Sequence, residues 1–294
     1  MAVGQNHMII GKSKTISMAK QAYRGSGRGR PADIPLPPAR MPFLRAGRML
    51  KRWRYVSIWS ANLSICVGSV QVGPAQQEFW AIWHRAAGEL RERTRLRRRY
   101  VELTPGRVRV RDQEVDIDIT LDEHDGVEVV TYDGGAYTWT RKQIVRAHGV
   151  ARIRGRTLPV EATALIDDNA GYHRRHTAWH WSGGAGTTID GRGVAWSVIV
   201  GLNDSIQNSE RTVWLDGVPR EVEPVRFAHD LSTVEFATGE MLEFKQEAVR
   251  QRRDNLLLIR SRYRQPFGTF RGTLPGNVVL REAYGVMEEH VAVW

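Results

Sequence analysis

The sequence contains a single cysteine, Cys66, and no hydrophobic run long enough to cross a bilayer. One thiol cannot form an internal disulfide, which is typical of a reducing compartment, and we expect Cys66 to pack as a small apolar residue rather than act as a nucleophile. The longest apolar-rich stretch, Val194–Leu202, is far shorter than a membrane helix. Met1–Lys20 lacks the continuous apolar segment of a secretory signal. These absences predict a cytoplasmic protein without a membrane span.

A sustained helical pattern is also missing, and most of the chain reads as short strands separated by tight turns. In Val115–Leu121 every second residue is apolar, so one face of this strand should lie on a core while its aspartates face water. Asp216-Gly217 predicts a hairpin turn. Phe79–Leu96 fits either a helix or a hairpin, and Gly88 in its middle favours the hairpin. Around sixteen strands of this kind predict an all-β sandwich or a pair of barrels.

Composition divides the 294 residues into three parts. Residues 1–40 contain Gly25–Pro31 and Pro35–Pro38, which are typical of a flexible, basic, Gly/Pro-rich tail. We expect an N-terminal β lobe over residues 41–160 and a C-terminal β lobe over residues 161–294. The apolar share of 41% is enough for a substantial core. Because β barrels of this size also fold as single units, one domain or two intimate lobes both stay open.

The net charge of +11 is compatible with a nucleic acid or an anionic membrane as partner. Arginines recur at every second residue, for example at Arg107, Arg109 and Arg111, as on the solvated faces of separate strands. The charge is therefore spread along the chain, whereas a nucleic-acid footprint is usually clustered. Only Arg95–Arg99 is dense, and it is interpreted either as an anion patch or as a solvated surface. A nucleic-acid partner is thus disfavoured.

Residues 165–186 are the richest in chemically versatile side chains, with two aspartates, three histidines and two tryptophans between glycines. Asp168–His176 has the turn formers of a loop at the rim of a pocket, and the residues after it alternate as a strand. Trp179 and Trp181 share one face of that strand. They either pack in a core or form the wall of a cavity for a flat apolar ligand.

Several residues of this motif are candidates for acid–base chemistry. Asp167 and Asp168 point to opposite sides of an extended chain, so only one of them can face the interior. Desolvation beside aromatic surface would suit Asp168 to act as a general acid, although it could instead bond the backbone amides of the following turn. His176 and His180 would either shuttle protons or have a structural role.

Tyr172 and His173 are candidate ligand contacts in the same motif, and Glu288 and His290 are candidate contacts on one face of the last strand. The spacing of the three histidines of the motif would suit zinc on a helix, but it has no special meaning in a loop followed by a strand, so no metal site is expected. The sequence contains neither a nucleophile elbow nor a glycine-rich loop leading into a helix. No cofactor is expected.

Five tracts carry a resemblance to a known family. They are Pro35–Pro42, Lys51–Tyr55, Asp168–Ser182, Asn255–Gly268 and Tyr284–Glu288. Together they resemble the bacterial family catalogued as domain of unknown function 2804. That family is similar to two-lobed, lipocalin-like (calycin) proteins, among them carotenoid hydratases, the AttH group and lipocalin-like cyclases. The resemblance implies paired antiparallel half-barrels or barrels with a ligand cleft, and Asp168 is the nearest match to the catalytic acid of the hydratases. Asn169 and Ala170 depart from the Trp and Gly that usually follow this Asp in the family.

We therefore expect a protein that binds a hydrophobic small molecule in a β-barrel cleft, with catalysis left open. As an enzyme it would isomerise, hydrate or cyclise its ligand without a cofactor, with Asp168 as acid and His176 or His180 as relay. The alternative is a non-catalytic carrier or sensor of an apolar ligand that uses the same cleft. A nucleic-acid-binding protein is the third hypothesis. Kinship of fold does not choose among these functions.

Overall fold

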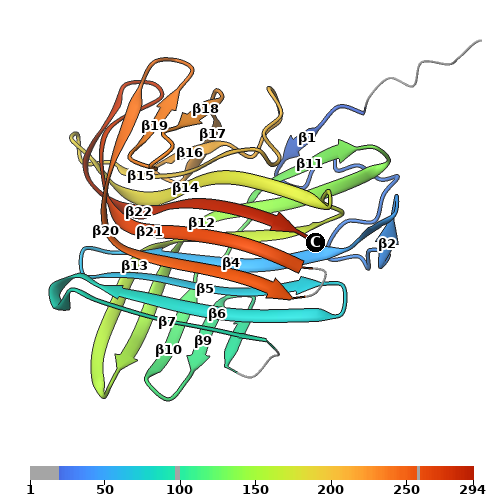
Figure 1. Ribbon diagram of the computed structural model, residues 1–294. Coiled ribbons are helices and arrows are strands. Elements are labelled where there is room, and N and C mark those ends of the chain that lie inside the picture. The colour runs from blue at the N-terminus through green and yellow to red at the C-terminus, as the bar shows by residue number, and fades with distance from the viewer. Residues whose placement is uncertain (1–19, 97–99, 257–258) are drawn as a thin grey trace, which may run out of the picture.

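Alternating apolar residues and tight turns produce a structure made almost wholly of β-strands. The computed structural model describes residues 20–96, 100–256 and 259–294, and within them the only helical element is the 3₁₀ turn η1 (Arg85–Ala87). The strands form two large antiparallel sheets that curl into half-barrels (Figure 1). The predicted all-β class with two half-barrels is therefore confirmed. No helix in this described part of the chain is long and apolar enough to cross a membrane.

The first half-barrel is an eleven-stranded sheet. Its strands are β1 (Tyr23–Gly25), β4 (Lys51–Trp59), β5 (Leu63–Val72), β6 (Ala75–His84), β7 (Glu89–Leu96), β8 (Val101–Thr104), β9 (Arg107–Arg111), β10 (Val115–Leu121), β11 (Val127–Asp133), β12 (Ala136–Ile153) and β13 (Arg156–Gly171). They pair in the order β7-β6-β5-β4-β13-β12-β10-β9-β8, and β11 pairs with β12 and β1. A small separate ribbon joins β2 (Leu44–Arg45) to β3 (Arg48–Met49).

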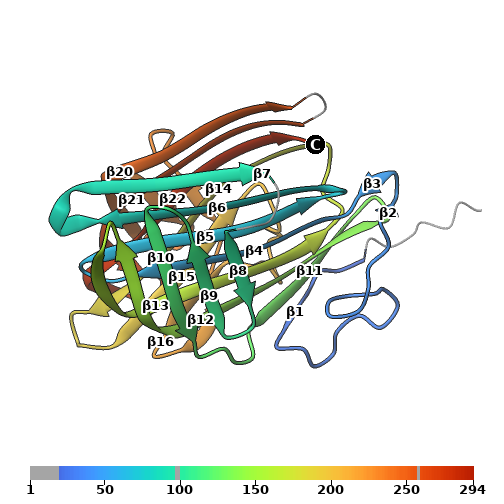
Figure 2. The ribbon, with the colours of Figure 1, turned by 90° about the horizontal axis from the view of Figure 1, so that it is seen from below.

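The second half-barrel is a nine-stranded sheet. Its strands are β14 (His176–Thr188), β15 (Gly193–Val200), β16 (Thr212–Leu215), β17 (Val218–Glu221), β18 (Val225–Phe227), β19 (Thr233–Phe236), β20 (Met241–Leu256), β21 (Ile259–Leu274) and β22 (Val278–Val293). They pair in the order β17-β16-β15-β14-β22-β21-β20-β19-β18. Figures 1 and 2 show β14 and β20 to β22 lying alongside β4, β5, β6 and β13 of the first sheet.

Three local predictions are confirmed. The four odd-numbered apolar residues of β10 are all buried, while Asp116 and Asp118 on its other face are not. Phe79–Leu96 is a hairpin of β6 and β7, and its turn ends at Gly88 with φ +62°. Asp216 and Gly217 join β16 to β17 with φ values of +49° and +80°. Positive φ at both turn residues matches the right-handed twist of the strands they connect.

The N-terminal segment differs from the expected flexible tail. Residues 1–19 lie outside the described part, but residues 20–40 pack against the first half-barrel. Ile34 and Leu36 are buried, Tyr23–Gly25 pairs with β11, and the hydroxyl of Tyr137 donates a hydrogen bond to the carbonyl of Pro35 at 2.6 Å. Apolar residues between the prolines therefore anchor a segment whose composition alone suggests disorder.

The change from one half-barrel to the other falls at residues 172–175, whereas the sequence suggested residue 160 as the end of the first lobe. The reason is the length of the β12–β13 hairpin, whose register continues from Ile153 opposite Arg156 to Thr138 opposite Gly171. Asp168–Gly171, expected in a loop, is consequently the end of a strand. This places the Asp pair of the motif on the first half-barrel and its tryptophans on the second.

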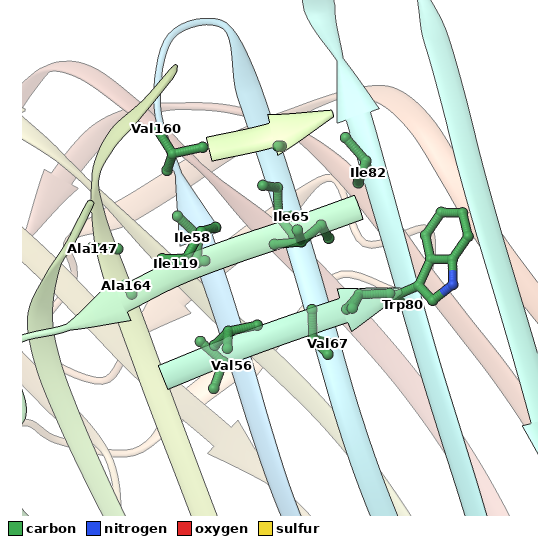
Figure 3. Close-up of a cluster of buried hydrophobic side chains, with 14 of the residues drawn as sticks. Val56, Ile58, Ile65, Val67, Trp80, Ile82, Ile119, Ala147, Val160 and Ala164 are labelled. Atoms are coloured by element: carbon green, nitrogen blue, oxygen red, sulfur yellow. The ribbon is translucent and has the colours of Figure 1, made fainter. Parts of the chain in front are cut away.

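Each half-barrel encloses its own core, and a third apolar cluster lies between them. The first core consists of aliphatic side chains with Trp80, and Figure 3 shows Val56, Ile65 and Val67 among them. The core of the second half-barrel contains aromatic rings as well as aliphatic groups. The third cluster joins the outer faces of both sheets; it includes Tyr55, Trp59, Cys66, Ala81, Trp83, Leu165, Trp181, Ala185, Ala195, Ile199, Trp214, Phe267 and Val286. Strand alternation therefore gives the central strands two buried faces.

Candidate functional site

A cavity of about 190 Å³ lies between the two half-barrels, at the edge of the third apolar cluster. The first half-barrel contributes residues of β4 to β7, β12 and β13. The second contributes residues of β14, β15 and β20 to β22, and of the segment between β15 and β16. Seven aromatic side chains line it: Trp53, Tyr55, Phe79, Trp179, Trp181, Tyr263 and Trp294. Gly68 makes room for one of them, because a Cβ there would lie 2.2 Å from the Phe79 ring. The cavity is thus rich in aromatic side chains, which is typical of sites for apolar small molecules.

The two tryptophans of the central motif have both of the roles considered for them. Trp181 is buried in the third cluster, and its indole Nε1 donates to the Ser197 hydroxyl at 2.9 Å. Trp179 is half-buried and lies nearly parallel to Trp53 of the opposite half-barrel, with ring centroids 6.5 Å apart and planes 13° apart. Both rings nevertheless line the cavity. Each indole therefore packs against the third cluster on one side and lines the cavity on the other.

Glu288 places a carboxyl group within this aromatic surface. Its Oε1 accepts a hydrogen bond from Trp179 Nε1 at 2.7 Å, and its Oε2 accepts bonds from the Tyr263 hydroxyl at 2.9 Å and from Gln265 Nε2 at 3.2 Å. None of the ion pairs among the described residues involves this carboxyl. Burial raises the pKa of Glu288 above its usual range, and the hydrogen bonds from Trp179 and Tyr263 offset only part of the effect. A carboxyl group with a raised pKa is better suited than an ordinary one to donate a proton.

The hydrogen bonds around Glu288 extend across the interface between the half-barrels. Gln265 Nε2 also donates to the Tyr55 hydroxyl at 3.0 Å, and its Oε1 accepts a weak bond from the Cys66 thiol at 3.4 Å. Burial raises the pKa of both Tyr55 and Tyr263 well above the usual tyrosine value, and raises that of Cys66 to about 12. Cys66 is therefore an inert thiol, and the two phenols act as neutral groups.

His290 lies two residues further along the same face of β22. Its Nε2 is 2.8 Å from the Ser261 hydroxyl, and its ring packs against Trp179 at a centroid distance of 4.3 Å. Burial, with the charge of Arg250 as a second cause, lowers the pKa of His290 to about 3. The imidazole is consequently neutral in the folded protein at neutral pH. It can accept or donate one hydrogen bond but cannot serve as a cationic acid.

A buried arginine forms part of the same wall. Arg250 on β20 is 3% exposed, and its Nε pairs with Glu92 at 2.8 Å. Its guanidinium carbon lies 4.2 Å from the centroid of the Phe79 ring and 5.0 Å from that of Tyr263. Cation–π contacts of this kind are strongest where water is excluded. Arg250 therefore contributes a fixed positive charge beside the aromatic rings of the wall.

A second charged group in the wall combines Lys142, Asp167 and Glu210. Lys142 Nζ lies 3.0 Å from Asp167 Oδ2 and 3.4 Å from Glu210 Oε1. Burial opposes the charged form of Lys142, but the two carboxylates outweigh it and raise the lysine pKa. Burial likewise raises the pKa of Glu210, although Lys142 opposes that shift. We refer to these three residues as the Lys142 triad.

The structure places Asp168 away from the cavity. Arg54 Nη1 lies 2.9 Å from both of its carboxylate oxygens, and Arg141 Nη2 lies 2.8 Å from Oδ2, so two guanidinium groups hold it. Arg54 also pairs with Glu123. Because neighbours on a strand face opposite sides, the aspartate that lines the cavity is Asp167. The ion pairs of Asp168 also replace the turn cap considered as its alternative role.

The remaining residues of the motif lie in separate environments. His176 is exposed at the start of β14, and His180 stacks on Phe227 at 5.8 Å, outside the cavity wall. The Tyr172 hydroxyl donates to the carbonyl of Pro42 at 2.7 Å, in the cluster that anchors the N-terminal segment. His173 is buried behind the wall, where its ring stacks on Trp53 at 5.1 Å. Across the described residues, no group of three His, Cys, Asp or Glu side chains is arranged to hold a metal ion.

The predicted contacts that lie in the cavity wall are Trp179, Trp181, Glu288 and His290. Reasoning from sequence missed Lys142, Glu210 and Arg250, because they come from strands and a loop far from the motif. A charged residue on the mixed face of a predicted strand was the signal that identified Glu288. This signal is hidden where both neighbours in sequence are also polar or charged, as at Lys142 and Glu210. Of the dense Arg95–Arg99 run, residues 97–99 lie outside the described part.

Comparisons with known proteins agree with this architecture. The chain is similar to a putative AttH from Nitrosomonas europaea, with 14% identity over 87% of this chain and 98% of that one and a TM-score of 0.55. It is also similar to kievitone hydratase from Nectria haematococca, with 11% identity over 81% and 88% of the two chains and a TM-score of 0.53. No curated protein matches the sequence. At these identities the likeness concerns the fold alone.

A family match is more specific. Residues 89–294 match the family described as Domain of unknown function (DUF2804), and this region contains the Asp pair, both tryptophans and the Glu288 strand. The family resemblance found in the sequence is therefore confirmed, and the chain belongs to the DUF2804 family.

Proposed function

We propose that the protein binds a hydrophobic small molecule in the cavity between its half-barrels and donates a proton to it from Glu288. The observation that carries this proposal is a carboxyl group with a raised pKa among aromatic rings, without a cation paired to it among the described residues. A protonated carboxyl in a water-poor site is suited to add a proton to an apolar ligand. The acid-catalysed forms of isomerisation, hydration and cyclisation begin with such a step.

Two further observations support a small-molecule ligand. The lining combines seven aromatic side chains with a few polar groups at defined places, which is the usual composition of ligand pockets. The similar solved structures include an enzyme named as a hydratase of kievitone. These features favour an apolar ligand with a small number of polar or unsaturated groups.

A non-catalytic carrier or sensor is the second candidate function. It is favoured by the three hydrogen bonds that already engage both oxygens of Glu288. In a carrier these bonds would fix the rings of Trp179 and Tyr263 and so shape the cavity. The two functions share the binding site and differ only in whether the proton of Glu288 moves to the ligand.

Binding is tested with 1-aminoanthracene, a flat apolar fluorophore. Its emission should rise on entering the cavity while tryptophan emission falls, because Trp179 and Trp181 form the wall. Replacing the Trp53 indole by a smaller side chain, Trp53→Ala, should weaken binding by about tenfold, since it removes one aromatic face. Binding that is unchanged in Trp53→Ala would place the probe elsewhere.

Proton transfer is tested in deuterated water. Wild-type protein incubated with a chloroform extract of cells should introduce carbon-bound deuterium into a component of the extract, detected by mass spectrometry. Glu288→Gln should lose this labelling while still binding 1-aminoanthracene. Glu289→Gln is the matched control, because Glu289 is the next residue on β22 and pairs with Arg262 on the other face at 3.0 Å. Equal labelling by Glu288→Gln and wild type would rule out the acid role and favour the carrier.

A further inference from the structure

The Lys142 triad is a second set of ionisable groups in the cavity wall. Lys142 and Asp167 are paired directly across β12 and β13, and Glu210 reaches them from the segment before β16 of the other half-barrel. Asn203 Nδ2 donates to Glu210 Oε2 at 3.1 Å, which orients that carboxyl. Groups from both half-barrels therefore meet at one ammonium.

Stability alone does not require charged groups at this position. Well-packed apolar residues commonly replace a buried ion pair without loss of stability, because desolvation cancels much of the attraction. Here two carboxyl groups share one lysine, so the triad carries either one unbalanced negative charge or one additional proton. Two carboxyl groups held close together in a buried site are characteristic of sites that move protons.

Within the triad, Asp167 is the member that faces the cavity. Its side chain is 16% exposed, against 2% for Lys142 and 5% for Glu210. All three residues nevertheless contribute to the cavity lining. Asp167 is also close enough for its charge to add to the rise in the pKa of Glu288, after the larger effect of burial. The two carboxyl groups therefore act on each other across the same space.

We propose that Asp167 is the base that works opposite Glu288 on an apolar substrate with a carbon–carbon double bond, and that Lys142 and Glu210 are positioning residues for it. This inference rests on the proposed function and adds the group that accepts a proton after Glu288 has donated one. In a hydration, the π electrons of the double bond take the proton of Glu288 and form a C–H bond. A water oxygen then bonds to the other carbon, and the proton of that water passes to Asp167. Exchange with solvent returns the proton to Glu288.

The base is tested with 5-nitrobenzisoxazole, a flat apolar compound that opens when a base removes its ring C–H proton. The N–O bond breaks, a nitrile forms, and a coloured phenolate is released while the proton stays on the base. Wild-type protein should open it with saturation kinetics, faster than free acetate at equal concentration. Asp167→Asn should lower the rate by about a hundredfold, the lower end of the usual contribution of a general base. This variant leaves Lys142 paired with Glu210, so no bare charge is buried.

Glu289→Gln is again the matched control and should keep the wild-type rate. Retained binding of 1-aminoanthracene reports that the Asp167→Asn cavity is intact. If that variant does not fold, it is replaced by Asp167→Ser with added sodium formate, and formate should restore activity.

An unchanged rate in Asp167→Asn, or no rescue of Asp167→Ser by formate, overturns the inference. So does a rate lost in Glu288→Gln but not in Asp167→Asn, which would make Glu288 the base. If wild type binds 1-aminoanthracene but does not open 5-nitrobenzisoxazole, the base is refuted while the binding site stands; absence of binding refutes the proposed function itself.

Discussion

The core of the first half-barrel and the cavity between the sheets are built from the same strands but differ completely in chemistry. On β4, Val56 and Ile58 face the core, whereas Trp53 and Tyr55 face the cavity. The core consists of aliphatic groups and one indole, all closely packed. The cavity is lined by aromatic rings, four carboxyl groups, a lysine and three arginines around an open space of about 190 Å³. One face of the sheet serves the fold alone, whereas the other face also holds charged groups that folding does not need.

The contrast is also electrostatic. Several pKa values are displaced in the cavity wall: those of Glu288 and Glu210 are raised and that of His290 is lowered, in each case chiefly by burial. The members of the first core have no ionisable side chains. Ionisable groups are destabilising when they are desolvated without full compensation, so the presence of several of them in one cavity indicates a functional site.

The largest expected effect comes from removing the charge that balances the cavity carboxylates. Lys142→Met should reduce the free energy of unfolding at neutral pH by about 3–5 kcal/mol, because it leaves Asp167 and Glu210 buried without a cation. Urea unfolding followed by tryptophan fluorescence measures the change. Adding Asp167→Asn and Glu210→Gln to the same variant should recover most of the loss. A loss of less than about 1 kcal/mol would mean that water solvates the triad and that the contrast with the core is small.

Two valines on β5 compare the two faces directly. Val67 is fully buried in the first core, and Val70 lines the cavity. Val67→Ala should destabilise the protein by about 2–3 kcal/mol, since it loses buried methyl groups and leaves a void. Val70→Ala should lose less than about 1 kcal/mol, because that side chain already borders open space. Equal losses in urea unfolding would show that the cavity is packed as tightly as the core.

Taken over a single unit of pH, the smallest expected effect is a pH dependence due to His290. Its pKa is about 3 in the folded protein and near the ordinary histidine value of 6.5 when unfolded. Between these values only the unfolded chain binds the proton, so stability should fall by about 1.4 kcal/mol for each unit of pH lost below 6.5. His290→Asn should make that fall shallower over the same range. His176→Asn, at an exposed position, is the control, and an identical slope in His290→Asn and wild type would contradict the burial of this ring.

Local patterns predicted the parts of the fold that depend on neighbours in sequence. The alternation of β10, the turn at Asp216-Gly217 and the hairpin at Gly88 all follow from rules acting over a few residues. The packing of Ile34 and Leu36 did not follow, because a proline-rich segment acquires order only from the surface against which it lies. The position of Asp168 in a strand was missed because turn-forming residues are tolerated where cross-strand pairing and burial compensate.

The candidate site divides in the same manner. Alternation along β14 and β22 correctly grouped Trp179 with Trp181 and Glu288 with His290, each pair on one face of its strand. It also implied that only one of two adjacent aspartates can face inward. Which of the two does so depends on the register of β13 against β4 and β12, and this register is set by partners more than a hundred residues away in the case of β4.

By itself, the sequence determined the β architecture, the family and the sharing of faces along each strand, because these depend on the period of side chains and on short turns. Only the tertiary structure decided that the outer faces of two curled sheets meet, that Asp167 rather than Asp168 lines the space between them, and that Lys142 and Glu210 join it there. The physical reason is that packing of whole sheets, and the desolvation that comes with it, is a property of surfaces assembled from distant segments.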